Sequence, residues 1–128
     1  MELRPLALLL SQESLAICRL PADATVPPWA FEGDFVSITR TSEELAIVCL
    51  DGTVPASVRR ERPWRRLSVR GPLEFSLVGV LASIAAPLAQ AGISLFVVST
   101  FDTDHVLVKQ SDLERACAAL RDAGHTII

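Results

Sequence analysis

The stretch LFVVSTFDTDHVLV, residues 95–108, consists of two apolar runs joined by residues that carry hydroxyl and carboxylate groups. Such a pattern is typical of two antiparallel strands and the turn between them. A similar stretch, FVSITRTSEELAIV, lies sixty residues earlier, at residues 35–48, and aligns without a gap, with Thr41 on Phe101. A chance likeness between two hairpins is the alternative. The alignment favours two copies of one supersecondary unit.

The sequence around the second copy alternates between strand and helix patterns. Helical spacing of apolar residues has Ser76 as a candidate N-cap, Gly92 at the end and Pro87 inside, where it predicts a kink or an early break. Ser111 and Glu114 form a capping box for a last helix. The expected order is βαββαβ. The elements are a strand at 67–70, a helix at 76–91, strands at 93–99 and 106–109, a helix from 111 to 124, and a strand at 126–128.

The first half of the sequence has the same strands but a poorer helix pattern. Apolar runs at 6–10 and 15–20 predict two strands with a tight turn at Gln12 and Glu13. The stretch PADATVPPWAFEGD, residues 21–34, predicts a loop with at most one helical turn around 28–31. A hairpin follows, with its turn at 41–44 and its end at Asp51 and Gly52. The first copy is therefore expected to lack its long helix.

Residues 53–66, TVPASVRRERPWRR, interrupt the apolar pattern and contain five arginines. We interpret them as a solvated linker with Trp64 inserted into the core, although a local patch for nucleic acid or an acidic partner is conceivable. The predicted domains are therefore residues 1–62, an N-terminal degenerate unit, and residues 63–128, a complete C-terminal unit.

The composition excludes several classes of protein. Half of the 128 residues are hydrophobic, 5% are aromatic, none is Tyr, and the formal net charge is −3. The apolar share excludes intrinsic disorder. The scarcity of aromatic residues argues against a base-stacking surface, and the charge provides no basic field. We therefore expect no nucleic-acid partner.

The three cysteines, Cys18, Cys49 and Cys117, are far apart and form no CxxC spacing. This argues against a zinc ribbon or a redox dithiol, and the apolar surroundings predict buried, reduced thiols. The apolar run LALLL at residues 6–10 is too short for a signal peptide or a membrane span. A cytoplasmic protein with no membrane partner is expected.

The pattern WRRLSVRGPLEFSLVGVL (64–81) followed by AGISLFVVSTFDTDHVLVK (91–109) resembles the tandem ACT-domain family of small bacterial proteins. It is also similar to each half of the CASTOR cytosolic arginine sensors. The resemblance implies an α+β fold with two ferredoxin-like ACT units, the first degenerate. It further implies an amino-acid effector site at an interface between ACT domains, with no catalytic residues and no cofactor.

A free amino acid needs a group that binds its carboxylate and another that accepts from its ammonium. The start of the helix after Phe75 offers unpaired N–H groups, and Gly79 allows close approach to the backbone. The resemblance places further contacts on the helix turn, on the hairpin, and on a strand start contributed by a facing ACT domain. The implied ligand-binding residues are Leu77, Val78, Gly79, Val80, Thr100, Phe101, Asp104, Ser94 and Leu95.

Three further residues bear on specificity and on other kinds of site. Leu77 stands where the arginine sensors are expected to have an acidic residue, so a neutral or small amino acid is as good a candidate as arginine. Asp104 and His105, where an aromatic residue is more usual, point to opposite faces of a strand, so we expect no metal site. Asp104 also has a structural alternative, capping the turn. His125 is expected at the surface or an edge.

These observations predict a non-enzymatic, amino-acid-binding regulatory protein that acts as a homodimer, with an as yet unknown protein partner. Pairing would cover the edge strands and apolar helix faces that small units leave exposed. Two alternatives stay open: an interaction module that has kept the fold and lost the ligand, and an in-trans regulatory subunit of an amino-acid biosynthetic enzyme.

Overall fold

The Arg-rich stretch expected to be a linker is instead an 11-residue strand, β5 (Arg59–Val69). The computed structural model describes residues 5–73 and 78–128. They form two units: unit 1 comprises the chain up to Gln12 together with Arg65–Ile128, and unit 2 comprises Glu13–Trp64. Strand β5 contributes to both units, which a solvated linker could not do. The observed division also differs from the expected one, because the first strand belongs with the C-terminal half.

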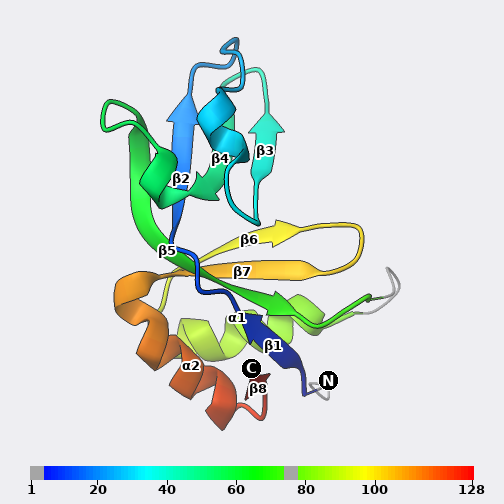
Figure 1. Cartoon of the computed structure of the whole chain (residues 1–128). Helices are drawn as coiled ribbons and strands as arrows, with labels where there is room; N and C mark the ends of the chain where they lie inside the picture. The colour runs from blue at the N-terminus through cyan, green and yellow to red at the C-terminus, as the bar shows by residue number, and fades with distance from the viewer. Residues whose placement is uncertain (1–4, 74–77) are drawn as a thin grey trace. The chain divides into compact units, whose positions relative to one another are not determined.

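Unit 1 contains the βαββαβ order expected for the second half, with one strand added (Figure 1). Its sheet order is β6-β7-β5-β1-β8. Strand β1 pairs antiparallel with β5 and parallel with β8, so it lies between the first and last strands of the βαββαβ unit. The elements are β1 (Ala7–Leu10), the end of β5, α1 (Val80–Gln90), β6 (Leu95–Ser99), β7 (Asp104–Lys109), the 3-10 helix η3 (Gln110–Asp112), α2 (Leu113–Asp122) and β8 (Thr126–Ile127).

Unit 2 has the same strand order without the α-helices. Its strands follow β3-β4-β2-β5, so the third and second strands lie beside the first, as in unit 1, and the fourth lies on the other side. Short 3-10 helices stand at the two places where unit 1 has α1 and α2. The elements are β2 (Leu15–Leu20), η1 (Pro28–Phe31), β3 (Ser37–Arg40), β4 (Leu45–Leu50), η2 (Asp51–Thr53) and the start of β5. The predicted α+β fold of ferredoxin-like units, the first degenerate, is confirmed.

The strands expected at 6–10 and 15–20 are present, but the turn expected at Gln12 and Glu13 does not make them a hairpin. Strand β1 pairs with β5 through Leu8 opposite Val69, and β2 pairs with β5 through Leu15 opposite Trp64. Both pairings are antiparallel, so β5 is the partner of each strand.

The two hairpins have the same turn but a different offset from the one expected. Thr41 N–H donates to the Glu44 carbonyl at 2.9 Å, and Thr100 N–H donates to the Thr103 carbonyl at 2.8 Å. Thr41 therefore corresponds to Thr100, an offset of 59 residues rather than 60. The 3-10 helices beginning at Asp51 and at Gln110 keep the same offset. The correction matters because a slip of one residue moves every side chain of a strand to the other face.

Helix α1 begins later than expected and continues through its proline. Gly79, with φ of 84°, precedes the first turn, and Ser76 lies outside the described residues. Pro87 causes no early break, since the helix runs on to Gln90. Gly92 ends it as expected: Gly92 N–H donates to Ala89 and Ile93 N–H to Leu88, the two bonds of a Schellman motif.

His125 supplies the hydrogen bond that Pro87 cannot. Proline has no N–H, so the carbonyl four residues earlier, that of Ser83, loses its helical donor. His125 Nε2 lies 2.8 Å from the Ser83 carbonyl oxygen, while its Nδ1 accepts from the Leu6 N–H at 3.0 Å. This arrangement requires the tautomer with the proton on Nε2. The side chain is only 5% exposed, so the expected surface position of His125 is wrong.

The capping box expected at Ser111 and Glu114 does not form. These residues fall at η3 and the start of α2, whose N-cap is Asp112 and has no side-chain hydrogen bond to the helix. The Asp112 carboxylate instead pairs with Arg115 at 3.1 Å. The 3-10 helix moves the helix start two residues beyond the position that a capping box at Ser111 requires.

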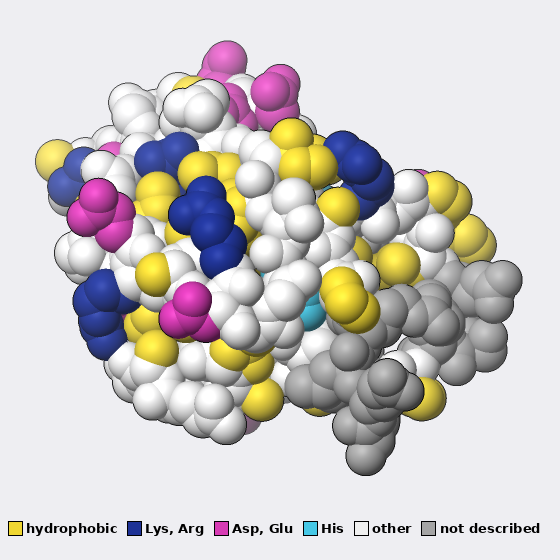
Figure 2. Space-filling model, turned by 90° about the horizontal axis from the view of Figure 1, so that it is seen from below, with side chains coloured by type: hydrophobic (Ala, Val, Ile, Leu, Met, Phe, Trp, Pro, Cys, Tyr) yellow, Lys and Arg dark blue, Asp and Glu magenta, His cyan; other side chains and the backbone are white. Residues whose placement is uncertain are grey.

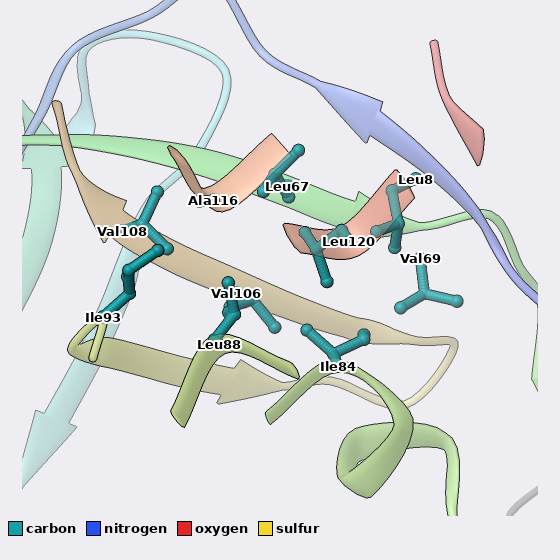
Figure 3. Close-up of a cluster of buried hydrophobic side chains, with 10 residues drawn as sticks. All are labelled: Leu8, Leu67, Val69, Ile84, Leu88, Ile93, Val106, Val108, Ala116 and Leu120. Atoms are coloured by element: carbon teal, nitrogen blue, oxygen red, sulfur yellow. The ribbon is translucent and has the colours of Figure 1, made fainter. Parts of the chain in front are cut away.

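The two units have cores of different composition. In unit 1, α1 and α2 cover one face of the sheet with large aliphatic side chains (Figure 3). The core of unit 2 consists largely of small side chains, and η1 contributes only Ala30. The buried cluster of unit 1 is Leu8, Leu67, Val69, Ile84, Leu88, Ile93, Val106, Val108, Ala116 and Leu120. That of unit 2 is Ala16, Cys18, Ala30, Leu45, Ile47, Cys49 and Val54.

The remaining expectations about burial hold. The three cysteines are free and buried, and Trp64 is buried. Among residues 5–73 and 78–128, neither helix has the length and apolar character needed to cross a bilayer.

Candidate functional site

One end of the unit 1 sheet gathers most of the residues expected to bind a ligand. Strand β7 runs antiparallel to β5, so the β6–β7 turn lies beside the end of β5, where the chain continues toward α1 (Figure 1). Thr103 Oγ1 donates to the Val69 carbonyl at 2.6 Å, and Leu73 N–H donates to the Asp102 carbonyl at 2.7 Å. The turn is therefore held against the segment that follows β5.

Gly71 allows this close approach. A Cβ atom at this position would lie 3.0 Å from the Asp102 carbonyl oxygen and 3.2 Å from the Thr103 Cβ. Because the first neighbour is backbone, a side chain at Gly71 would push the turn away from the segment.

Asp104 lies at the first position of β7 with its carboxylate at this end of the sheet. It is opposite Ser99, whose hydroxyl donates to Asp104 Oδ1 at 2.6 Å. Alternation along the strand puts Asp104 on the same face as Val106 and Val108, the face that the helices cover. The carboxylate is half-buried and keeps lone pairs for a further donor.

The start of α1 adds backbone donors and apolar surface. Gly79 precedes the helix without a side-chain cap, and the first turn contains no acidic residue. Such a terminus carries N–H groups and a partial positive charge that favour a carboxylate. Val78 is 84% exposed and Phe101, in the β6–β7 turn, is 78% exposed. The end of unit 1 thus combines an anion-favouring helix start, a carboxylate and apolar side chains.

The predicted residues divide into two groups by position. Val78, Gly79 and Val80 lie at the helix start, and Thr100, Phe101 and Asp104 lie in or beside the turn, at the same end of the sheet. Leu77 lies outside the described residues. Ser94 and Leu95 lie at the other end of β6, where Leu95 is opposite Val108. A single unit 1 therefore does not bring these two residues to the turn.

The other face of the unit 1 sheet carries a polar cluster that the sequence analysis missed. His105 Nδ1 lies 2.8 Å from Ser68 Oγ and 3.3 Å from Arg66 Nη1, which also donates to Ser68 Oγ at 2.7 Å. Burial, with a smaller effect from the Arg66 charge, lowers the pKa of His105. Ser68 is only 7% exposed. Alternation in the strand patterns of residues 66–69 and 105–108 was the signal that could have paired them.

The arginines of β5 make specific contacts within the units. Arg62 pairs with Asp51 at 2.7 Å, Arg60 donates to the Pro55 carbonyl at 2.8 Å, and Arg65 donates to the Ser11 carbonyl at 2.7 Å. On the face shown in Figure 2, basic side chains are scattered rather than gathered in one patch. The described part of the chain contains no group of three or more His, Cys, Asp or Glu side chains suited to a metal ion.

Two family models match the chain, and their boundaries follow its two units. The model of the ACT domain matches residues 59–122. A second model, described as an N-terminal domain, matches residues 13–57, which fall within unit 2.

The chain is similar to curated sensors over part of their length. It is 33% identical over 97 residues to the rat "cytosolic arginine sensor for mTORC1 subunit 1", covering 73% of this chain and 28% of that protein. The human protein of the same name is 45% identical over 51 residues, covering 39% of this chain and 16% of its own length. The chain thus spans less than a third of either relative.

Solved structures show the same fold. A protein from Agrobacterium tumefaciens is 44% identical with a TM-score of 0.92, covering 98% of this chain and 93% of its own. The regulatory subunit of aspartate kinase from Thermus flavus has a TM-score of 0.64 at 12% identity, covering 94% of this chain and 99% of its own. The second likeness concerns the fold alone.

Proposed function

The chain belongs to the ACT-domain family, and from this premise we propose that it is a non-enzymatic regulatory protein that binds a free amino acid. The relatives named as arginine sensors support this class of function. The ligand would occupy the end of unit 1 between the start of α1 and the β6–β7 turn. Its binding would shift a conformational or partner-binding equilibrium through different affinities for the two states.

The observation that carries the proposal is the arrangement of opposite polarities at this end. The helix start at Gly79 favours the ligand's carboxylate, and Asp104, held by Ser99 at 2.6 Å, favours its ammonium or a cationic side chain. Phe101 and Val78 provide apolar contact for the side chain. A zwitterion needs both polar groups close together with room between them for its carbon chain.

We further propose that a second copy of the chain completes the site. Ser94 and Leu95 lie at the far end of β6 from Asp104, so they reach a ligand only if they come from another unit 1. A homodimer in which the end carrying Ser94 faces the end carrying Asp104 would bring both groups to one ligand. Such pairing also covers the exposed side chains of Val78 and Phe101.

A thermal-shift screen of the twenty amino acids tests the proposal. A ligand at a hundredfold excess over its Kd adds about 2.7 kcal/mol to the free energy of unfolding. We expect at least one amino acid to raise the Tm, and Asp104→Asn to abolish the increase. Asp102→Asn is the matched control, because its exposed side chain lies in the same turn and its carbonyl contact with Leu73 is retained.

Two results would contradict the proposal in different ways. If no amino acid raises the Tm, the sensor function fails and the interaction-module alternative gains support. If an amino acid raises the Tm of Asp104→Asn as much as that of the wild type, the ligand binds elsewhere. Sedimentation with and without the effective amino acid then tests whether the dimer forms the site.

A further inference from the structure

Arg40, at the end of β3 in unit 2, places its guanidinium on two backbone carbonyls. Nη1 donates to the Ala22 carbonyl and Nη2 donates to the Ala24 carbonyl at 2.7 Å. Both carbonyls belong to the segment that follows β2. A planar guanidinium that uses two nitrogens on two acceptors is held in a defined orientation, unlike a solvated arginine side chain.

The same place in unit 1 is the end of the sheet described above. At the offset of 59 residues that relates the two turns, Arg40 corresponds to Ser99, and Leu45 corresponds to Asp104. Arg40 lies opposite Leu45 just as Ser99 lies opposite Asp104. The segment carrying Ala22 follows the first strand of unit 2, as residues 70–73 follow β5.

The side chains also point to the same side in the two units. Leu45 belongs to the buried core of unit 2, and directly opposite residues of an antiparallel pair share a face. Arg40 is therefore on the core side of its sheet. Asp104 is likewise on the face that α1 and α2 cover in unit 1, with Ser99 opposite it. The equivalence thus holds for position along the strand and for face.

The charges at the two places are interchanged. Unit 2 has a cation from its own chain, Arg40, beside the apolar Leu45. Unit 1 has a carboxylate, Asp104, beside the short hydroxyl side chain of Ser99. The second arrangement leaves a negative charge and the volume of an arginine side chain at the position where the first is already filled.

We propose that the Ala22 and Ala24 carbonyls form a cation site in unit 2 that Arg40 occupies as an internal substitute for a ligand. The chemical class that fits is a guanidinium or alkylammonium cation, because the acceptors are uncharged carbonyls that take N–H donors. Its interpretation as the counterpart of a ligand position in unit 1 rests on the proposed function. It follows that the wild-type chain binds effector in unit 1 alone.

Replacing Arg40 with the residue of unit 1 tests this directly. Arg40→Ser removes the guanidinium and copies Ser99, and methylguanidinium is the probe, since it carries the cation without an amino-acid backbone. Amide NMR spectra during titration should show saturable shifts at residues 22–25 in Arg40→Ser. The wild type and Arg59→Ser, which changes an exposed arginine of β5, should show none there. No shift in Arg40→Ser, or equal shifts in all three proteins, overturns the proposal.

A measurement on the wild type covers the case in which Arg40→Ser fails to fold. The guanidinium nitrogens of Arg40 should give separate NMR signals, because two hydrogen bonds restrict rotation about the Nε–Cζ bond. Averaged signals like those of Arg59 would overturn the proposal. The result is independent of the amino-acid screen, since effector binding in unit 1 is followed at the amides of residues 100–104 with amino acids as probes. Either proposal can therefore fail alone.

Discussion

Units 1 and 2 share their strand order and their hairpin turn, and they differ in what covers the sheet. In unit 1, α1 and α2 bring Ile84, Leu88 and Leu120 onto the strands. In unit 2, two 3-10 helices stand in their places, and η1 brings Ala30. The comparison shows that the order of four strands is kept when both helices are lost, provided that the side chains beneath become small.

The difference in cover also decides which unit has an open end. In unit 1 the segment after β5 leads to a helix whose N-terminal N–H groups have no side-chain cap. In unit 2 the segment after β2 folds back, and its carbonyls accept from Arg40. Loss of the helix thus accompanies replacement of an external ligand by a side chain of the same unit.

The largest expected effect tests whether the helices supply most of the packing. Leu88→Ala removes a fully buried side chain of α1, and we expect it to lower the free energy of unfolding by about 3 kcal/mol. In unit 2, Cys49→Ala removes only one sulfur atom and should cost about 1 kcal/mol. Urea unfolding followed by circular dichroism reports α1 and α2, while tryptophan fluorescence reports unit 2, which contains Trp29 and Trp64.

Leu81→Ala is the control for this comparison, because Leu81 lies on the same helix and is 37% exposed. Its effect should be well below that of Leu88→Ala. If Cys49→Ala proves as costly as Leu88→Ala, the small-residue core of unit 2 is as tightly packed as the helical core, and the comparison drawn here is wrong.

The second prediction tests the support that α1 receives at its proline. His125→Ala leaves the Ser83 carbonyl and the Leu6 N–H without their partners, so we expect a loss of about 2 kcal/mol in urea unfolding. Pro87→Ala restores a helical N–H for the Ser83 carbonyl. The double variant should therefore lose less than the sum of the two single variants. Strict additivity in this cycle would show that His125 does not compensate for Pro87.

The smallest effect concerns a titratable group that unit 1 has and unit 2 lacks. His105 corresponds to Ala46 at the offset of 59 residues, and burial together with Arg66 lowers the pKa of His105 below its ordinary 6.5. As pH falls below 6.5, the unfolded chain takes up a proton before the folded chain does. The stability due to the neutral imidazole is thus fully present above that pH and is lost as pH falls through the folded pKa.

Replacing this group with the residue of unit 2 gives the measurement. The free energy of unfolding of the wild type should decline from about pH 7.5 to about pH 5 more steeply than that of His105→Ala. Other titrating groups are common to both proteins, so the difference in slope isolates His105. Parallel pH profiles would mean that the folded environment of His105 does not disfavour its protonation.

Sequence patterns predicted the fold well where they were local. The hairpin turn at 41–44, the helical turn around 28–31 and the end of α1 at Gly92 depend on neighbouring residues, and all are present. The repeat was detected, but its offset was one residue too long. A gapless alignment matches apolar runs as a whole, whereas the hydrogen bonds of Thr41 and Thr100 fix the register.

The candidate site was predicted in part for the same reason. Proximity of Asp104 to the start of α1 follows from the antiparallel course of β5 and β7, which the βαββαβ pattern implies. The clusters formed by His125 and by His105 were missed, because their partners lie 42 and 37 residues away in the sequence. Arg40 drew no attention for a similar reason, since nothing in its own strand signals the carbonyls of Ala22 and Ala24.

The sequence alone determined the family resemblance, the two hairpins and the loss of a long helix from the first copy. These features are encoded in the order and spacing of residues along the chain. Only the tertiary structure decided that β1 joins the C-terminal unit, that β5 is a strand and that His125 supports the helix at Pro87. Each depends on a backbone or side-chain group finding its hydrogen-bond partner in a distant segment, and the folded chain alone brings those segments together.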